Sequence, residues 1–148
     1  MSRERGALGV AETLVGRVLD DMRRVLGVDD PLTLETTNAL AFAKLQRGGV
    51  EEAETLFAGA IEALEERGDR PEELYTTMSN LALLLHRTNR HDEAQASYER
   101  ALEGLREHLG AEHPTSMTCL CNLASLHNDR RAFAEAEPLL DEAIALQE

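Results

Sequence analysis

The chain has 148 residues, of which 29% are charged and 43% hydrophobic, and this length and balance suit one folded domain with its own core. Its 24 Leu and 20 Ala, set against two Tyr, three Phe and no Trp, favour helices over sheets and predict an all-α fold. A net charge of −13 disfavours nucleic acid and anionic membranes as partners and favours neutral or basic ones.

The sequence carries no sign of export or membrane insertion. No apolar run is long enough to cross a bilayer, and the first ten residues lack the apolar core of a signal peptide. Cys119 and Cys121 are too close together for an ordinary disulfide and too few for a disulfide framework. We therefore expect a cytoplasmic chain without membrane partners.

A repeat of about 42 residues organises the sequence. A shift of 41 places Phe57 on Tyr98, and a shift of 42 places Tyr98 on Leu140. The same shifts superpose three sets of alanines, which are Ala41, Ala82 and Ala124; Ala53, Ala94 and Ala136; and Ala60, Ala101 and Ala143. We interpret these small side chains as sites where two helices pack closely.

Glycine and proline predict where the helices end and begin. Gly27, Gly68 and Gly110 each stand three or four residues before a proline, and Asp30 is suited to cap the helix that starts at Pro31. Second breaks fall at 48–49, 89–90 and 129–131. In chain order, the predicted helices span 7–26, 31–47, 51–67, 71–88, 91–109, 114–129 and 132–147.

These elements predict a right-handed α-solenoid of antiparallel helix pairs. We expect a single domain over 1–148, with a half-repeat at 7–26 and repeats at 27–67, 68–109 and 110–148. A helix pair with leucines on two faces cannot bury both faces by itself, so neighbouring pairs stack.

The repeated residues resemble the tetratricopeptide repeat (TPR) family. The resemblance lies in Asn80-Leu81-Ala82 of a first helix, in Glu-Ala with a later aromatic and Ala in the second, and in the linkers 26–31 and 109–114. The 42-residue spacing is similar to the long-helix TPRs of kinesin light chains and of bacterial regulatory proteins. Residues 133–140 match that type closely, with Pro138 expected in the first turn of a second helix, where only a free backbone donor is lost.

The resemblance implies a non-catalytic scaffold whose first helices line a groove for a peptide of a partner protein. The groove residues carried over from the family are Asn38, Phe42, Leu45, Ser79, Asn80, Leu83, His86, Arg87, Cys121, Asn122, Ser125 and Asn128.

Several groove residues have a purely structural alternative. Asn80 and Asn122 are expected to bind a peptide backbone, because an amide offers both donors and an acceptor, or else to satisfy a carbonyl of a neighbouring helix. Phe42 and Leu83 either form apolar pockets in the groove or are ordinary core residues. The basic clusters at 86–91 and 130–131 either bind a partner carboxylate or pair with nearby acids.

The sequence gives little support for catalysis or for binding of a metal or cofactor. The five histidines do not form a metal-binding spacing, and Cys119 and Cys121 lie on different sides of a predicted helix. We therefore expect no enzyme activity, no metal and no cofactor. Two alternatives to a peptide-binding scaffold stay open, namely self-assembly through exposed ends of the array and a regulatory domain of a larger signalling protein.

Overall fold

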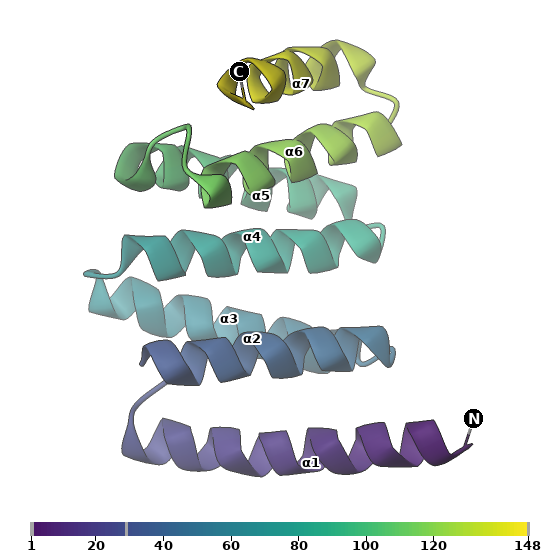
Figure 1. Ribbon diagram of the computed structural model, residues 1–148, viewed down its shortest axis with the longest axis vertical. Coiled ribbons are helices and arrows are strands. Elements are labelled where there is room, and N and C mark those ends of the chain that lie inside the picture. The colour runs from purple at the N-terminus through teal and green to yellow at the C-terminus, as the bar shows by residue number, and fades with distance from the viewer. Residues whose placement is uncertain (1, 29, 148) are drawn as a thin grey trace. The chain divides into compact units, whose positions relative to one another are not determined.

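The computed structural model describes the backbone of residues 2–28 and 30–147 and the side chains of residues 9, 10, 13–28 and 30–147. The described backbone forms seven helices and no strand (Figure 1). The helices are α1 (Ser2–Val25), α2 (Pro31–Gln46), α3 (Val50–Arg67), α4 (Pro71–Arg87), α5 (His91–Leu109), α6 (Pro114–Asp129) and α7 (Phe133–Gln147). The predicted all-α solenoid of stacked helix pairs is confirmed.

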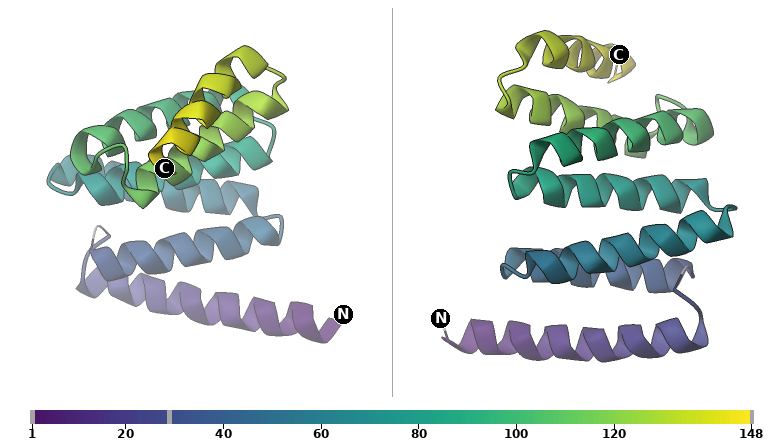
Figure 2. Two further views of the ribbon diagram at one scale, coloured as in Figure 1. Left: turned by 45° about the horizontal axis from the view of Figure 1, so that its top comes forward. Right: turned by 180° about the vertical axis from the view of Figure 1, so that it is seen from behind.

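The chain divides into two compact units. Unit 1 ends at Arg67 and holds α1–α3, and unit 2 starts at Gly68 and holds α4–α7. In unit 1, α2 contacts both α1 and α3. In unit 2, α5 lies between α4 and α6, α4 and α6 also touch, and α7 packs on α6 (Figure 2). The assignment of all 148 residues to one domain stays a prediction.

The first helix is longer than the sequence predicts. α1 begins at Ser2 instead of near residue 7. Residues 3–5 are Arg, Glu and Arg, which are good helix formers, and a single glycine at position 6 is not enough to stop a helix. Asp29, which belongs to the predicted linker 26–31, lies outside the described residues.

Side chains cap α2 and α6, each of which is the first helix of its pair. The predicted cap of α2 is confirmed, because Asp30 Oδ1 accepts a hydrogen bond of 3.0 Å from the Leu32 amide. At the start of α6, His113 Nδ1 accepts one of 3.1 Å from the Thr115 amide. Both bonds satisfy amide groups that a helix start leaves without an intrahelical partner.

The turn inside each helix pair repeats with the same backbone geometry. Gly48, Asn89 and Arg131 have positive φ angles of 85°, 63° and 59°. The next residue closes the turn onto the helix, with amide-to-carbonyl bonds of 2.7 Å from Gly49 to Lys44, 2.9 Å from Arg90 to Leu85 and 2.8 Å from Ala132 to His127. These bonds satisfy carbonyls at the helix end, as in a Schellman turn.

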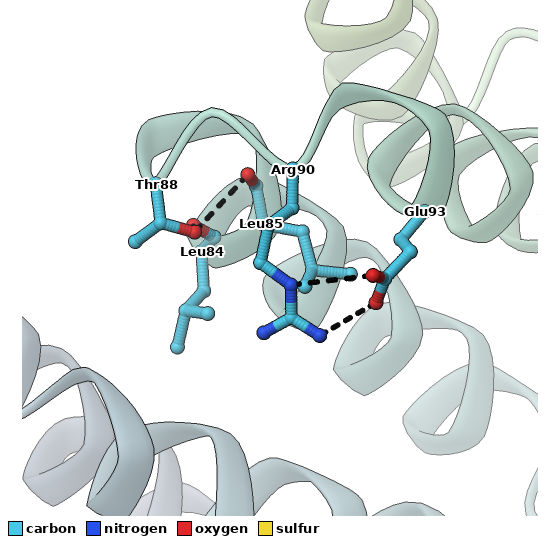
Figure 3. Close-up of polar contacts among 5 residues, drawn as sticks. All are labelled: Leu84, Leu85, Thr88, Arg90 and Glu93. Carbon is cyan, nitrogen blue, oxygen red and sulfur yellow. Dashed lines mark hydrogen bonds and ion pairs between the residues drawn. The ribbon is translucent and has the colours of Figure 1, made fainter.

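Side chains reinforce the turn between α4 and α5. The Thr88 hydroxyl donates to the carbonyls of Leu84, at 3.0 Å, and Leu85, at 3.2 Å. Arg90 donates two bonds to the Glu93 carboxylate, the shorter at 2.6 Å (Figure 3). Both contacts are local, because they join residues at most four positions apart.

All nine repeated alanines are buried, as expected for packing residues. The larger buried side chains of unit 1 are Leu19, Leu34, Leu40, Phe57 and Leu64. Those of unit 2 are Met78, Leu84, Leu85, Tyr98, Leu102, Leu105, Cys119, Leu120, Leu123 and Leu126. In both units, small and large side chains together fill the core.

In unit 2, an aromatic ring packs closely against a glycine of α5. Gly104 of α5 is buried under the ring of Tyr75, and a Cβ atom built at Gly104 would lie 2.5 Å from three ring carbons. The Tyr75 ring also stacks on His108, with 5.8 Å between ring centroids. An alanine at position 104 would force this ring to move.

Pro138 lies deeper in its helix than the sequence predicts. It is the sixth residue of α7, so it removes a donor from the second turn and leaves the Ala134 carbonyl without its intrahelical bond. Both residues are exposed, so water can satisfy this carbonyl. The expectation that only a first-turn donor is lost is therefore wrong.

Replacing Ala94 by leucine tests the close packing of the helix pairs. Ala94 of α5 is fully buried, so the larger side chain overpacks the core and should lower the free energy of unfolding by about 1–3 kcal/mol. Ala96 is exposed on the same helix, and Ala96→Leu serves as the matched control. Denaturant unfolding followed by circular dichroism measures both variants, and equal stability of the two would contradict the packing.

Replacing Arg131 by glycine tests the turn geometry. Arg131 has a φ of 59°. This backbone conformation raises the free energy of a residue that has a Cβ atom but not that of glycine. After the larger unfolded-state entropy of glycine is allowed for, Arg131→Gly should raise the free energy of unfolding by about 0.5–1 kcal/mol. Asn89→Gly should give a smaller gain, because asparagine tolerates this conformation better. A loss of stability in the Arg131 variant would contradict the assigned turn.

Candidate groove site

A cavity of about 640 Å³ in unit 2 lies at the first helices of its two repeats, α4 and α6. It is lined by Leu83, His86, Arg87, Asn89, His91, Asn122, Ser125 and Asp129. Five of these eight residues are groove residues predicted from the sequence. Of the other three, His91 belongs to the predicted basic cluster at 86–91, whereas Asn89 in the turn after α4 and Asp129 at the end of α6 were not predicted as groove residues.

Helical spacing explains why these side chains meet. Leu83, His86 and Arg87 are three and four residues apart, so they share one face of α4. Asn122, Ser125 and Asp129 likewise follow one face of α6.

A hydrogen bond joins the two first helices across the cavity. His86 Nε2 on α4 lies 2.6 Å from Asp129 Oδ2 on α6. The His86 side chain is largely buried, and its ring contacts His91 and Tyr98 edge-on at centroid distances of 5.9 and 6.2 Å. His86 therefore fixes the floor of the cavity and the spacing of α4 and α6.

Arg87 gives the cavity a positive charge. Its side chain is exposed and makes no ion pair within the described part of the chain. Burial raises the pKa of the Tyr98 hydroxyl above its ordinary value of 10, and Cys119 raises it further, while Arg87 acts in the opposite direction. The Arg87 charge is thus available to a bound molecule.

The two asparagines expected to bind a peptide backbone are half-buried. Asn122 lines the cavity, whereas Asn80, three residues before Leu83 on α4, does not. Among the described residues neither side-chain amide makes a hydrogen bond, so neither satisfies a carbonyl of a neighbouring helix. Water or a ligand must then meet their hydrogen-bonding needs.

Comparison with known proteins identifies the family. The family model described as tetratricopeptide repeat matches residues 73–148, which is just over half of the chain. The chain belongs to the tetratricopeptide repeat family. No curated protein matches the sequence.

Solved TPR structures share the fold over nearly the whole chain. BtubC (BKLC) from P. vanneervenii is 30% identical, with a TM-score of 0.83 over 95% of this chain. This chain spans only 57% of the BtubC chain. The nearly identical TPR-like repeats of a Podosopora anserina kinesin light chain-type protein are 23% identical and share the fold, with a TM-score of 0.76 over 98% of this chain and 69% of theirs. A variant form of the same repeats gives a TM-score of 0.78.

The expected TPR assignment is thereby confirmed, and the chain shares the fold of the kinesin light chain-type repeats. TPR arrays are generally non-catalytic scaffolds for protein–protein interaction, and this is the class of function that the fold supports.

Not all predicted groove residues of this TPR chain reach the cavity. Ser79 is buried in the core, and Cys121 and Asn128 are exposed on α6 without lining the cavity. Spacing along a helix gives the direction of a side chain only approximately. It therefore could not predict that Ser79 lies in the core while its neighbour Asn80 is half-buried.

The predicted groove residues of unit 1 are Asn38, Phe42 and Leu45, and all three are half-buried. Asn38 Oδ1 is buried and has no hydrogen-bond partner in the described structure. The Phe42 ring packs edge-on against the fully buried Phe57, with 5.5 Å between ring centroids. Phe42 thus contributes to the core of its helix pair.

Two basic side chains near the turns, Arg130 and Arg90, pair with acids of the same unit. Arg130 donates to Asp92 at 2.6 Å and to Gln95 at 2.9 Å, beside a second cavity of about 500 Å³ on the α5 side of α6. Arg90 pairs with Glu93 at 2.6 Å. These contacts favour the structural interpretation of both residues and leave Arg87 as the cation that faces the groove cavity.

Two searches of the described residues bear on other functions. They contain no group of three or more His, Cys, Asp or Glu side chains placed to hold a metal ion. No helix among them is both long and apolar enough to cross a membrane.

Thiol labelling tests the placement of the two cysteines. Burial raises the pKa of Cys119 to about 11, although a side-chain hydrogen bond with Ser79 and the charge of Arg106 act in the opposite direction. The thiolate is the reactive form, so at pH 8 we expect one thiol, Cys121, to react rapidly and the second to react only in denaturant. Rapid reaction of both thiols in the native protein would place Cys119 outside the core.

Proposed function

We propose that this TPR chain binds a peptide segment of a partner protein against α4 and α6, in the 640 Å³ cavity. The observation that carries the proposal is the joint lining of this cavity by Leu83, Arg87 and Asn122. Within the described part of the chain, they supply an apolar surface, a cation without an ion pair and an amide without a hydrogen bond.

The asparagines account for binding that does not depend on the peptide sequence. A side-chain amide can donate to a backbone carbonyl and accept from a backbone N–H at the same time. Asn122 lies in the cavity, and Asn80 lies one turn before Leu83 on the neighbouring helix. A peptide that follows α4 and α6 can therefore meet one amide from each helix.

The side chains of the peptide would select among partners through the other residues. Leu83 favours an apolar group, whereas Arg87 and Asp129 present charges of both signs. The net charge of −13 acts at longer range and favours the approach of neutral or basic segments. We expect a segment with little net negative charge and at least one apolar anchor.

The cavity is formed before the peptide arrives. The bond between His86 and Asp129 and the buried alanines Ala82 and Ala124 fix the positions of α4 and α6. A ligand then loses little free energy in ordering the protein, which favours binding by a short segment.

Peptide selection with matched alanine variants tests the proposal. Peptides from a displayed random library are selected on the wild-type protein, and their affinity is measured for Asn80→Ala, Asn122→Ala and the double variant. Each amide supplies one or two hydrogen bonds of about 1 kcal/mol, so each substitution should weaken binding roughly 5- to 30-fold.

The matched control is Asn128→Ala, which makes the same change on α6 at an exposed residue outside the cavity. It should leave the affinity unchanged, and all variants should keep wild-type circular dichroism. Full affinity in the Asn80/Asn122 double variant would place the binding site elsewhere.

A further inference from the structure

One position of the second helix is a glutamate in all three repeats. It is Glu52 in α3, Glu93 in α5 and Glu135 in α7, which shifts of 41 and 42 residues superpose. Lys44 pairs with Glu52 at 2.6 Å. Arg90 pairs with Glu93 at 2.6 Å (Figure 3). In the first two repeats, the chain itself thus supplies a cation to this carboxylate.

The glutamate of the third repeat has no such cation. The Glu135 carboxylate makes no ion pair and no hydrogen bond within the described part of the chain. The position equivalent to Lys44 is His127, and the position equivalent to Arg90 is Ala132. Histidine does not carry the permanent charge of lysine, and alanine carries none. The residues that pair with this glutamate in the first two repeats are therefore replaced in the third.

Glu135 and His127 line the second cavity, of about 500 Å³. Glu99 of α5 lines it as well, so the cavity has carboxylates from two helices. The Glu99 carboxylate accepts a bond of 3.0 Å from an amide on the same helix and keeps further acceptor sites. Arg130, also in the lining, is already paired with Asp92 at 2.6 Å. The cavity can therefore accept a further positive charge.

A buried polar side chain at this cavity also lacks a partner. His127 is 6% exposed, and its ring makes no hydrogen bond with any described residue. Buried polar groups of proteins are nearly always hydrogen-bonded, to the protein or to a bound molecule. Because His127 lines the second cavity, a molecule in that cavity is placed to contact its ring.

An equivalent cavity in unit 1 shows that this space belongs to the repeat. Lys44 and Glu52, which the repeat superposes on His127 and Glu135, both line a cavity of about 480 Å³. The chain continues beyond α3, and the cavity of unit 1 is open all the same. The second cavity therefore does not depend on where the array ends.

We propose that the second cavity binds an arginine side chain of a partner protein, which supplies the charge that Lys44 supplies in unit 1. The guanidinium pairs with Glu135 and Glu99, and its flat face packs on the imidazole ring of His127. Its five donors suit two carboxylates better than the three donors of a lysine. The second cavity and the groove cavity share no lining residue, so this contact is separate from the proposed peptide site.

Titration with N-acetyl-L-arginine methylamide, followed by NMR of the histidine imidazoles, tests the proposal. The His127 resonances should shift along a saturable isotherm. The citrulline analogue has a similar shape without the charge and should cause no shift, and the lysine analogue should bind more weakly. Glu135→Gln and Glu99→Gln should each weaken binding of the arginine derivative roughly 3- to 10-fold, because each removes a charge-assisted hydrogen bond.

Glu137→Gln is the matched control, because it makes the same change on α7 at an exposed residue outside the second cavity. It should leave the affinity unchanged, as should the Asn80/Asn122 double variant of the groove. Circular dichroism should show that all variants are folded. Three results would overturn the proposal. They are the absence of a saturable shift at His127, equal or tighter binding of the citrulline or lysine analogue, and wild-type affinity in Glu135→Gln.

Discussion

The close approach of paired helices at alanine is the constraint on which the structure depends. Ala82 and Ala94 illustrate it in unit 2, because both are fully buried on the two helices of one pair. A larger side chain at either position would push the helices apart and displace the leucines that pack around them. At Gly104, the ring of Tyr75 occupies the space that a Cβ atom would need. Small residues thus set the spacing, and large residues fill what remains.

Fixed helix spacing has a direct consequence for binding. In unit 2, the first helices α4 and α6 present polar side chains such as Asn122 and Ser125 to the groove cavity. Asn80 and Asn122 are half-buried without hydrogen-bond partners in the described structure, while His86 and Asp129 tie α4 to α6. Amides that are held in place and bound only to water can exchange that water for a peptide backbone at small cost. The scaffold and the proposed binding site therefore have the same physical origin.

Sequence repeats predicted the helices well because the signals were local. Glycine before proline marked the junctions, and Asp30 capped α2 as expected. The repeat also placed breaks at 89–90 and 129–131, and the structure has positive φ angles there at Asn89 and Arg131, which align with Gly48.

The site was predicted only in part, for two reasons. Spacing along a helix does not show how far the helix is rotated about its axis. The burial of Ser79 in the core was therefore not predicted. The bond of His86 to Asp129 joins residues 43 positions apart, and no pattern within one repeat reveals it. Gly104 was missed because the equivalent position in the last repeat is Leu146, so a small residue is not kept there in all three repeats.

Methyl NMR of the leucine side chains tests most directly that the first helices of unit 2 bind the partner. Leu83 lines the cavity, whereas Leu139 on α7 does not. When a peptide selected on the wild-type protein is added, we expect the Leu83 methyl resonances to shift with the binding isotherm and those of Leu139 to stay in place. Shifts at Leu139 without any at Leu83 would contradict binding at α4 and α6.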